Sequence, residues 1–288
     1  MLDLYKHIGN SLQALEGALR ISISNADNFN TPGFKYTFTS FTTVFNEVVS
    51  SGTTKLNPVQ YGGSMTTGST STDFSQGNIG FGTPMDLAIV GEGFFVMSQS
   101  SREFDAGAPK VFTRSGRFKT DFSGKFITDS FDRKLFGFKL NPDGSVQSNA
   151  LVPIQTDGET DVGFIEGGIL SANFQKNKDD IAKSVTAPTA LKPLYRLAIS
   201  SFVNKQGLIL TEGSALKATS ASGEPLPFGI SSEGKYGSIR AEALESSNIS
   251  VAKVALDMAQ LNRGFSAIQG VIDDVNKVTS QLMQKLIA

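Results

Sequence analysis

The strictest pattern in the chain is a run of apolar residues near its C-terminal end, spaced alternately by three and four positions. This spacing predicts one long helix with a narrow apolar seam, about 50 Å long, which Ser246, Ser247 or Asn248 can cap. Because a long helix packed along a single stripe is marginal by itself, the pattern predicts that other helices cover the seam. The seam consists of Val251, Val254, Met258, Leu261, Phe265, Ile268, Ile272, Val275, Leu282 and Leu286, with the polar Thr279 as its one interruption.

A second, shorter helical stripe lies at the N-terminal end. Pro32 restricts the residue before it to extended backbone and Gly33 tolerates a positive φ, so this helix should end by Asn30. The helix is about half as long as the C-terminal one and can cover only part of its seam. We therefore expect both ends to become ordered when the chain assembles with partners; a two-helix hairpin in a stable monomer is the alternative. The stripe consists of Ile8, Leu12, Leu15, Leu19 and Ile23.

The middle of the chain is typical of β structure. Seventeen of the 22 Phe residues lie between Phe29 and Phe138, and glycines recur at turn-like intervals. We interpret the Phe residues as core and not as a stacking platform for bases or sugars, since the chain has no Trp and no basic surround. The segment 85–97 predicts two strands around a hairpin turn at Gly91-Glu92-Gly93. Further strands are expected at 112–118, 124–128, 194–203 and 207–211.

These patterns indicate an α+β fold class and a division of the chain into several parts. Long N- and C-terminal helices, at 1–30 and 244–288, are expected to form a coiled-coil layer. A Phe- and Gly-rich β domain is expected to occupy the middle. It comprises 86–156 and 192–243, with 31–85 as a connector with extended segments and 157–191 as a variable insertion or loop.

Composition narrows the possible functions. The 26 basic and 27 acidic residues nearly cancel, and no basic stripe is present, which argues against nucleic-acid binding. Cys is absent and His7 is the single histidine, which removes thiol chemistry, most zinc sites and Ser-His-Asp triads. No stretch reaches the roughly 20 apolar residues of a membrane span. Polar side chains within the first 30 residues also leave no apolar core for a cleavable signal peptide.

The candidate chemical groups are better explained as structure. Gly91-Glu92-Gly93 lacks the third glycine of a dinucleotide-binding fingerprint, and His7 is interpreted as a surface or interface residue. The carboxylate pairs are interpreted as turn, loop or helix-surface groups: Asp121 and Asp129, Asp179 and Asp180, and Asp273 and Asp274. The sequence therefore predicts no enzyme and no catalytic, cofactor-binding, metal or small-molecule site.

Three separated motifs point to a known family. The first comprises Asn25, Asn28, Asn30, Thr31, Gly33, Phe34 and Lys35. The second comprises Asp86, Leu87, Ala88, Ile89, Gly91, Gly93, Phe94 and Phe95, preceded by Gln76-Gly77-Asn78 and followed by 112–118. The third comprises Leu244-Glu245 with Ser247 and Asn248. In this order they resemble the motifs of the bacterial flagellar rod and hook proteins, the axial family. Ser24 and Asp27 depart from the first motif. Residues 260–265 resemble a further element of the family, Gln-Arg-x-Phe/Tyr, from which Asn262 and Gly264 depart. The resemblance is lost over 141–191.

The resemblance implies a fold and a role. In that family the terminal helices form the inner layer of a helical tube that transmits torque and encloses the export channel. The implied partners are further copies of the chain, other rod and hook proteins and the flagellar type III export apparatus. The implied location is the basal body or hook, periplasmic or extracellular after export without a cleavable signal peptide. A rod subunit is favoured over a hook subunit; an exported β-rich binding protein or adhesin, and a carboxylate hydrolase, are the remaining alternatives.

Overall fold

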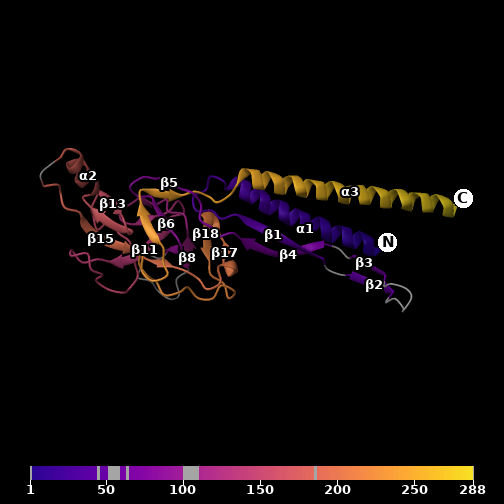
Figure 1. Cartoon of the computed structure of the whole chain (residues 1–288), viewed down its shortest axis with the longest axis horizontal. Helices are drawn as coiled ribbons and strands as arrows, with labels where there is room; N and C mark the ends of the chain where they lie inside the picture. Colours follow the sequence, from indigo (N-terminus) through magenta and orange to yellow (C-terminus); the bar gives the residue numbers. More distant parts are fainter. Residues whose placement is uncertain are drawn as a thin grey trace. The chain divides into compact units, whose positions relative to one another are not determined.

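The computed structural model describes residues 2–43, 46–50, 59–62, 65–99, 110–184 and 187–287. The chain divides into two compact units. The helical unit comprises Met1–Phe29, Tyr36–Asp73 and Ile249–Ala288, and the β unit comprises Asn30–Lys35 and Phe74–Asn248. The indigo and yellow helices of Figure 1 thus belong to the same unit, although they stand at opposite ends of the sequence.

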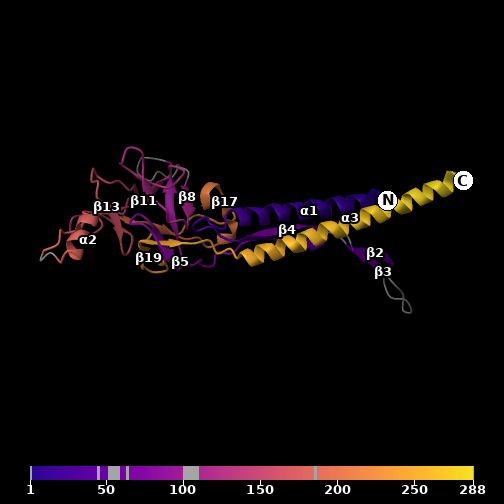
Figure 2. The ribbon, with the colours of Figure 1, turned by 90° about the horizontal axis from the view of Figure 1, so that it is seen from above.

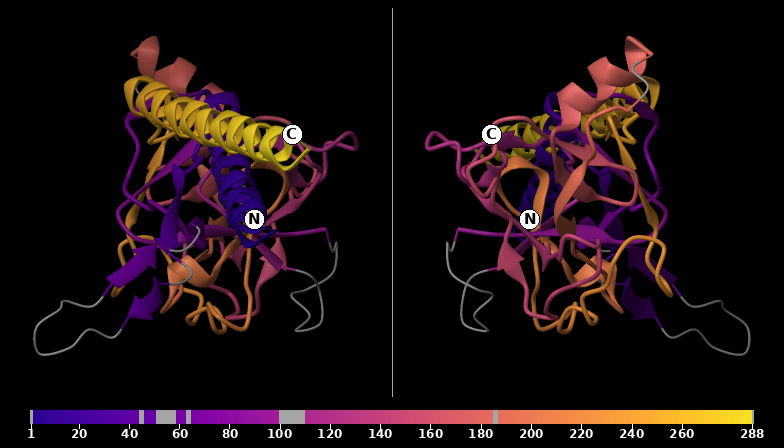
Figure 3. Two further views of the ribbon diagram at one scale, coloured as in Figure 1. Left: turned by 90° about the vertical axis from the view of Figure 1, so that its right-hand side faces the viewer. Right: turned by 90° about the vertical axis from the view of Figure 1, so that its left-hand side faces the viewer.

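Two long helices run side by side in the helical unit (Figures 1 and 2). α1 spans Leu2–Asp27 and α3 spans Val251–Ile287, where the two apolar stripes predict helices. Leu15 of α1 packs against Leu261 of α3, and the Tyr5 hydroxyl donates to the Asn276 side chain at 3.1 Å. Early positions of α1 therefore meet late positions of α3, so the helices are antiparallel. Figure 3 shows the same two helices from their ends.

The ends of these helices follow local capping chemistry. α1 ends at Asp27, before Asn30, as predicted, and the side chain of the following Asn28 donates to the Ser24 carbonyl at 2.8 Å. α3 begins directly after Ser250, whose carbonyl accepts the N–H of Val254 at 3.0 Å. The predicted cap at Ser246, Ser247 or Asn248 is therefore wrong. Asn248 lies upstream of the helix, and its side chain donates to the Ser75 carbonyl at 3.1 Å instead.

Two antiparallel strand pairs complete the helical unit. β1 (Thr37–Thr43) pairs with β4 (Met65–Thr72), and β2 (Asn46–Ser50) pairs with β3 (Val59–Gly62). β4 packs on α1, where the N–H of Met65 donates to the Ser11 hydroxyl at 3.2 Å. Within the segment expected as a connector with extended segments, β1 and β4 thus lie beside α1.

An antiparallel sheet forms the centre of the β unit. Among the described residues it has 12 strands, with the main path β13-β14-β15-β11-β7-β8-β18-β17, and β9, β10, β12 and β16 pair alongside. The short pairs β5 with β20 and β6 with β19 lie outside it. The strands are β5 (Ile79–Phe81), β6 (Leu87–Val90), β7 (Phe94–Ser98), β8 (Lys110–Thr113), β9 (Lys119–Thr120), β10 (Ile127–Thr128), β11 (Lys134–Lys139), β12 (Val152–Pro153), β13 (Val162–Ile165), β14 (Ile169–Ala172), β15 (Lys192–Leu197), β16 (Ile199–Ser200), β17 (Ile209–Leu210), β18 (Ala215–Lys217), β19 (Ser238–Ala241) and β20 (Ala243–Glu245).

The core lies on both faces of the central strands. Phe95 and Met97 of β7 belong to one apolar cluster, whereas Phe94 and Val96 belong to another. A strand that is buried on both faces reads as a continuous apolar run, as β7 does. Ten Phe side chains of the unit are buried, as their interpretation as core predicts: Phe34, Phe94, Phe95, Phe112, Phe118, Phe136, Phe138, Phe164, Phe174 and Phe202. Phe81 and Phe122 are fully exposed and Phe131 is partly exposed, so the interpretation as core does not hold for them. It does not hold either for the exposed Phe29, Phe38 and Phe41 of the helical unit.

The turn at Gly91-Glu92-Gly93 joins strands of different sheets. β6 pairs with β19, whereas β7 pairs with β8, β11 and β16, so the predicted hairpin is wrong. Gly91 has φ +100° and Gly93 has φ +133°, values that side-chain-bearing residues rarely adopt. These glycines turn the chain out of one sheet and into the next, and β6 and β7 therefore do not pair with each other.

The segment 157–191 contributes to the core. It contains β13, β14 and the helix α2 (Phe174–Ala182), and Phe164 and Leu170 are fully buried. The Asp161 carboxylate accepts the N–H groups of Gln175 and Lys176, in the first turn of α2. The described part of this segment is thus strands and a helix, and the expectation of a surface loop does not hold for it.

Candidate functional site

The three motifs of the sequence meet at one buried carboxylate in the β unit. The Glu245 side chain, on β20, is fully buried. Its Oε1 accepts the Lys35 ammonium at 2.6 Å and the N–H of Gly77 at 2.9 Å. The Nε of Arg114 lies 3.1 Å from Oε2. We call this group, Lys35, Gly77, Arg114 and Glu245 with the segments that carry them, the motif junction.

The first motif enters the motif junction through a glycine. The N–H of Gly33 donates to the main-chain carbonyl of Glu245 at 2.9 Å. Gly33 has φ +67°, and a Cβ at this position would lie 2.4 Å from the carbonyl carbon of Arg114. Only glycine therefore fits at this position without displacing backbone. Phe34, next in the chain, is buried, and its carbonyl accepts the N–H of Asn248 at 3.4 Å.

Arg114 connects the second motif to the same carboxylate. Its Nη1 donates to the carbonyls of Gly91 and Gly93, at 2.7 and 2.9 Å, which fixes the turn between β6 and β7. The Gln76 side chain holds the same region by donating to the Ile89 carbonyl and accepting the N–H of Gly91. Burial lowers the pKa of the Arg114 guanidinium, and the charge of Glu245 opposes this shift. The guanidinium stays protonated, so its charge needs a partner in the interior.

Ser75 joins the first and third motifs. The Lys35 ammonium donates to its carbonyl at 2.7 Å, and the Asn248 side chain donates to the same carbonyl at 3.1 Å. Lys35, Ser75 and Asn248 stand next to three places where the chain passes between the two units. The motif junction thus ties these three chain passages together on the β-unit side.

The remaining motif residues have structural partners. Asn25 is buried in the helical unit, where its side chain donates to the Thr37 carbonyl at 2.6 Å and accepts the Thr37 N–H at 3.0 Å. Asp86 is buried and accepts the N–H of Thr83. The Thr31 carbonyl accepts the N–H of Phe34. Leu87, Ala88 and Ile89 lie buried in β6 and Phe94 and Phe95 in β7, Asn28 and Ser247 are half-buried, and Asn30 is exposed.

The sequence reasoning identified Lys35 as a motif residue but missed its pairing with Glu245 and Arg114. These residues are separated by long stretches of chain, and no periodicity relates them. The available signal was chemical, because each of the three motifs includes a charged residue, namely Lys35, Arg114 and Glu245. Charged residues of this kind are almost never fully buried unless they are paired.

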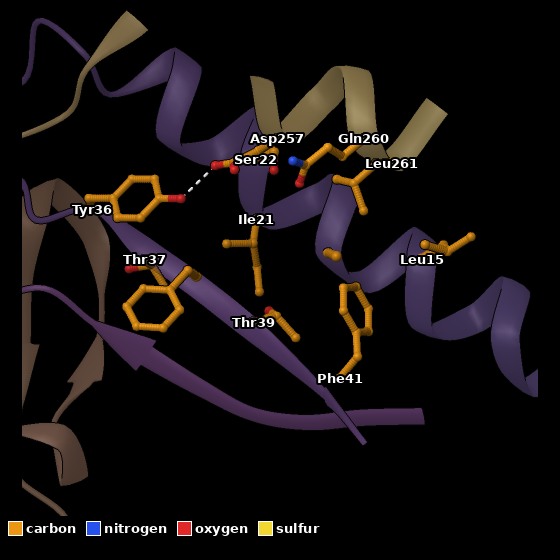
Figure 4. Close-up of a pocket in the computed structure, with 12 residues that line it drawn as sticks. Leu15, Ile21, Ser22, Tyr36, Thr37, Thr39, Phe41, Asp257, Gln260 and Leu261 are labelled. Atoms are coloured by element: carbon orange, nitrogen blue, oxygen red, sulfur yellow. Dashed lines mark hydrogen bonds between the residues drawn. The ribbon is translucent and has the colours of Figure 1, made fainter. Parts of the chain in front are cut away.

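An open groove lies within the helical unit, between α1, α3 and β1 (Figure 4). Its volume is about 340 Å³, and Leu15, Ile21, Phe41 and Leu261 supply apolar walls. The Tyr36 hydroxyl donates to Asp257 at 2.5 Å across one end, as Figure 4 shows. Burial, then the hydrogen bond and charge of Asp257, raise the pKa of the Tyr36 phenol. Tyr36 therefore remains a protonated donor that holds the start of β1, which begins at the next residue, to α3.

The predicted interface residues of α1 are only partly covered within the unit. Leu15 is buried, Ile8 and Leu19 are half-buried, and Leu12 and Ile23 are 40% and 43% exposed. The face of α1 that packs inward is formed mostly by small and polar residues: Ala14, Leu15, Ala18, Ser22 and Asn25. The Leu and Ile stripe thus lies to one side of the buried face and leaves apolar side chains in contact with solvent.

Coverage of the α3 seam declines towards the C-terminus. Val254 and Leu261 are buried, whereas Leu282 is 52% exposed. Val278 and Met283, beside the seam, are also exposed. Met258, Phe265, Ile268, Ile272 and Val275 are half-buried, Val251 is exposed, and the side chain of Leu286 lies outside the described part of the chain.

The described ranges contain no cluster of three or more His, Asp or Glu residues that could hold a metal ion. Within the same ranges, no helix combines the length and apolarity that a membrane span requires. Asp121 accepts hydrogen bonds from the N–H groups of Lys125 and Phe126, and Asp129 forms a buried ion pair with Arg133. The first is thus a turn carboxylate and the second a structural ion pair.

The chain has paired terminal helices, partly covered apolar seams and motifs that meet in a buried junction. These are features of a subunit that packs against other chains. No family model matches it. Flagellar basal-body rod protein FlgG of Buchnera aphidicola is 25% identical over 283 residues, which cover 96% of this chain and 95% of the relative. FlgG of Bacillus subtilis is 23% identical over 289 residues, which cover 98% and 97%.

The similarity extends to hook proteins over a shorter stretch. Flagellar hook protein FlgE of Helicobacter pylori is 36% identical over 127 residues, which cover 41% of this chain but 17% of the hook protein. The chain thus spans a small part of that relative and nearly the whole length of the rod proteins. It is a relative of the flagellar rod and hook proteins, and the resemblance drawn from its motifs is confirmed.

Proposed function

We propose that the chain is a structural subunit of the axial tube of the bacterial flagellar hook–basal body, and a rod subunit in preference to a hook subunit. The observation that carries this proposal is the similarity to rod proteins over 95% or more of both sequences. The match to the hook protein leaves most of that longer protein without a counterpart. The subunit has no enzymatic role in this assignment.

The terminal helices supply the contacts for assembly. In the tube, α1 and α3 of neighbouring copies form a coiled-coil layer, which covers the apolar side chains that solvent reaches in the single chain. Leu12, Ile23 and Leu282, each at least 40% exposed, support this role. A contact between different surfaces of identical copies, whose rotation does not close, produces an open helical filament. The filament transmits torque and encloses the export channel.

The partners follow from this placement. They are further copies of the chain, the rod and hook proteins at either end of the segment, and the flagellar type III export apparatus that delivers the subunit. The subunit then resides in the basal body or hook, outside the cytoplasmic membrane. A hook subunit is the second candidate, which the 36% identity to a hook protein favours over the matched stretch.

Leu282→Asp tests the role of the α3 seam in assembly. Leu282 is exposed in the single chain, so the substitution should leave the monomer folded, and a charge buried on assembly costs several kcal/mol. Gln284→Asp, on an exposed position of the same helix end, is the matched control. We expect electron microscopy of concentrated protein to show tubes for the control and none for Leu282→Asp, with equal helical circular dichroism of the monomers.

Normal tubes and normal motility in a strain that carries only Leu282→Asp would contradict the proposed assembly. The shape of the wild-type tubes separates the two candidates, since straight tubes support a rod subunit and curved tubes support a hook subunit. A chain that stays a folded monomer at all concentrations, even when a flagellar cap or neighbouring rod protein is added, would favour the alternative. In that alternative the terminal helices form a two-helix hairpin in a stable binding protein.

A further inference from the structure

The motif junction places two cations around a single anion in a closed site. The side chains of Lys35, Arg114 and Glu245 are 5%, 6% and 0% exposed. Glu92 also acts electrostatically on Arg114, but its side chain is 62% exposed and pairs with Lys205. Glu245 is therefore a buried carboxylate that pairs with both cations.

The two cations precede the carboxylate by a long stretch of chain. Lys35 and Glu245 are separated by 210 positions, and Arg114 also precedes β20. A chain is always synthesised from its N-terminus, so Lys35 and Arg114 exist before Glu245 does. Until β20 arrives, closing the site would bury two like charges without the carboxylate that pairs with both of them, which is strongly unfavourable.

The other contacts of the motif junction depend on the same late segment. The N–H of Gly33 needs the Glu245 carbonyl, the N–H of Gly77 needs the Glu245 carboxylate, and β5 pairs only with β20 among the described strands. Main-chain and side-chain contacts of residues 243–248 thus close the site from one side. Without that segment, the ammonium of Lys35 would lack the carboxylate with which it pairs.

We propose that Glu245 is the closing group of a completion lock: residues 30–35 dock into the β unit only after residues 243–248 have arrived. The use of such a lock rests on the proposed function, because a subunit that assembles through both ends must not enter a filament before its second end is present. The lock itself is a property of the single chain and is tested without assembly.

The test is hydrogen exchange of the full-length monomer with Glu245→Gln, which keeps the shape of the side chain and removes its charge. We expect protection of the Gly33 and Gly77 amides to fall at least about 100-fold, while amides of β7 keep theirs. Glu242→Gln, which removes a surface ion pair with Lys178, is the matched control. In Glu242→Gln, the protection of the Gly33 and Gly77 amides should stay within about fivefold of that in the wild type.

A second variant separates charge from shape. In Lys35→Met with Glu245→Gln, one of the two uncompensated cations is gone, so protection of Gly33 and Gly77 should recover at least about tenfold relative to Glu245→Gln alone. Unchanged protection in Glu245→Gln, loss of protection throughout β7, or no recovery in the double variant would each overturn the lock. Failure of the wild-type chain to form tubes would count against the proposed function and leave this result unaffected.

Discussion

Substitution of Gly33 by Ala tests the geometry by which the first motif enters the β unit. The position combines two separate obstacles to a side chain. Its φ of +67° lies in the left-handed region, and an added Cβ would come 2.4 Å from both the carbonyl carbon of Arg114 and the nitrogen of Ser115. Both contacts are with main chain, which cannot move aside as the end of a flexible side chain can.

The expected loss of stability follows from these two obstacles. Left-handed backbone costs Ala about 1–2 kcal/mol, and forcing extra atoms into a packed site costs about 1–3 kcal/mol. The lower entropy of the unfolded Ala chain returns about 0.4–1 kcal/mol. We therefore expect Gly33→Ala to destabilise the β unit by about 1–4.6 kcal/mol, with a central value of about 3 kcal/mol.

Gly124→Ala is the matched control for Gly33→Ala. Gly124 has φ +69°, close to that of Gly33, but nothing lies within 4 Å of its added Cβ. Gly124→Ala has the cost of left-handed backbone without the steric clash, so we expect a loss of stability of about 0.5–1.5 kcal/mol. Urea unfolding followed by far-ultraviolet circular dichroism measures both differences from the transition midpoints. Losses that agree within about 0.5 kcal/mol would refute the argument that the Arg114 backbone excludes a side chain.

Two further changes test the helical unit and the α2 region. Leu261→Ala removes a buried side chain that packs on Leu15, so it should destabilise the helical unit by about 2–4 kcal/mol, measured by thermal unfolding at 222 nm; a loss below about 0.5 kcal/mol would mean that this contact is not packed. Hydrogen bonds from the Thr189 hydroxyl and N–H lower the pKa of Asp180. Its stabilising contribution is therefore present at neutral pH and is lost as the pH falls below about 4, through the folded-state pKa. The small stability difference between wild type and Asp180→Asn should vanish over that range, and a difference that grows on acidification would contradict this sign.

The sequence was most informative where a periodic pattern coincided with the final packing. The α3 seam begins at Val251, and the helix begins at the same residue. In α1 the helix was predictable but its buried face was not. Ala14 and Ala18 face inward, since small residues let α3 and β4 approach closely, and Leu12 remains exposed.

Pairings between distant segments could not be derived from local patterns. The glycine turn before Phe94 predicts a change of direction, but not that β6 and β7 join different sheets. The motif junction depends on a hydrogen bond between residues 210 positions apart, which come together only in the folded chain. The segment 157–191 was underestimated because its strands β13 and β14 are short, although Phe164, Leu170 and Phe174 are buried.

The β unit consists of two separate segments of the chain. This decides where a chimaera must be cut if the unit is to be exchanged between related proteins. Residues 74–248 alone are not a transferable module, because Asn30–Lys35 belongs to the same unit and contributes Gly33 and Lys35 to its interior. A chimaera cut only at 74 and 248 would combine the lysine of one parent with the carboxylate of another. A chimaera must therefore take the six residues Asn30–Lys35 and the segment Phe74–Asn248 from the same parent.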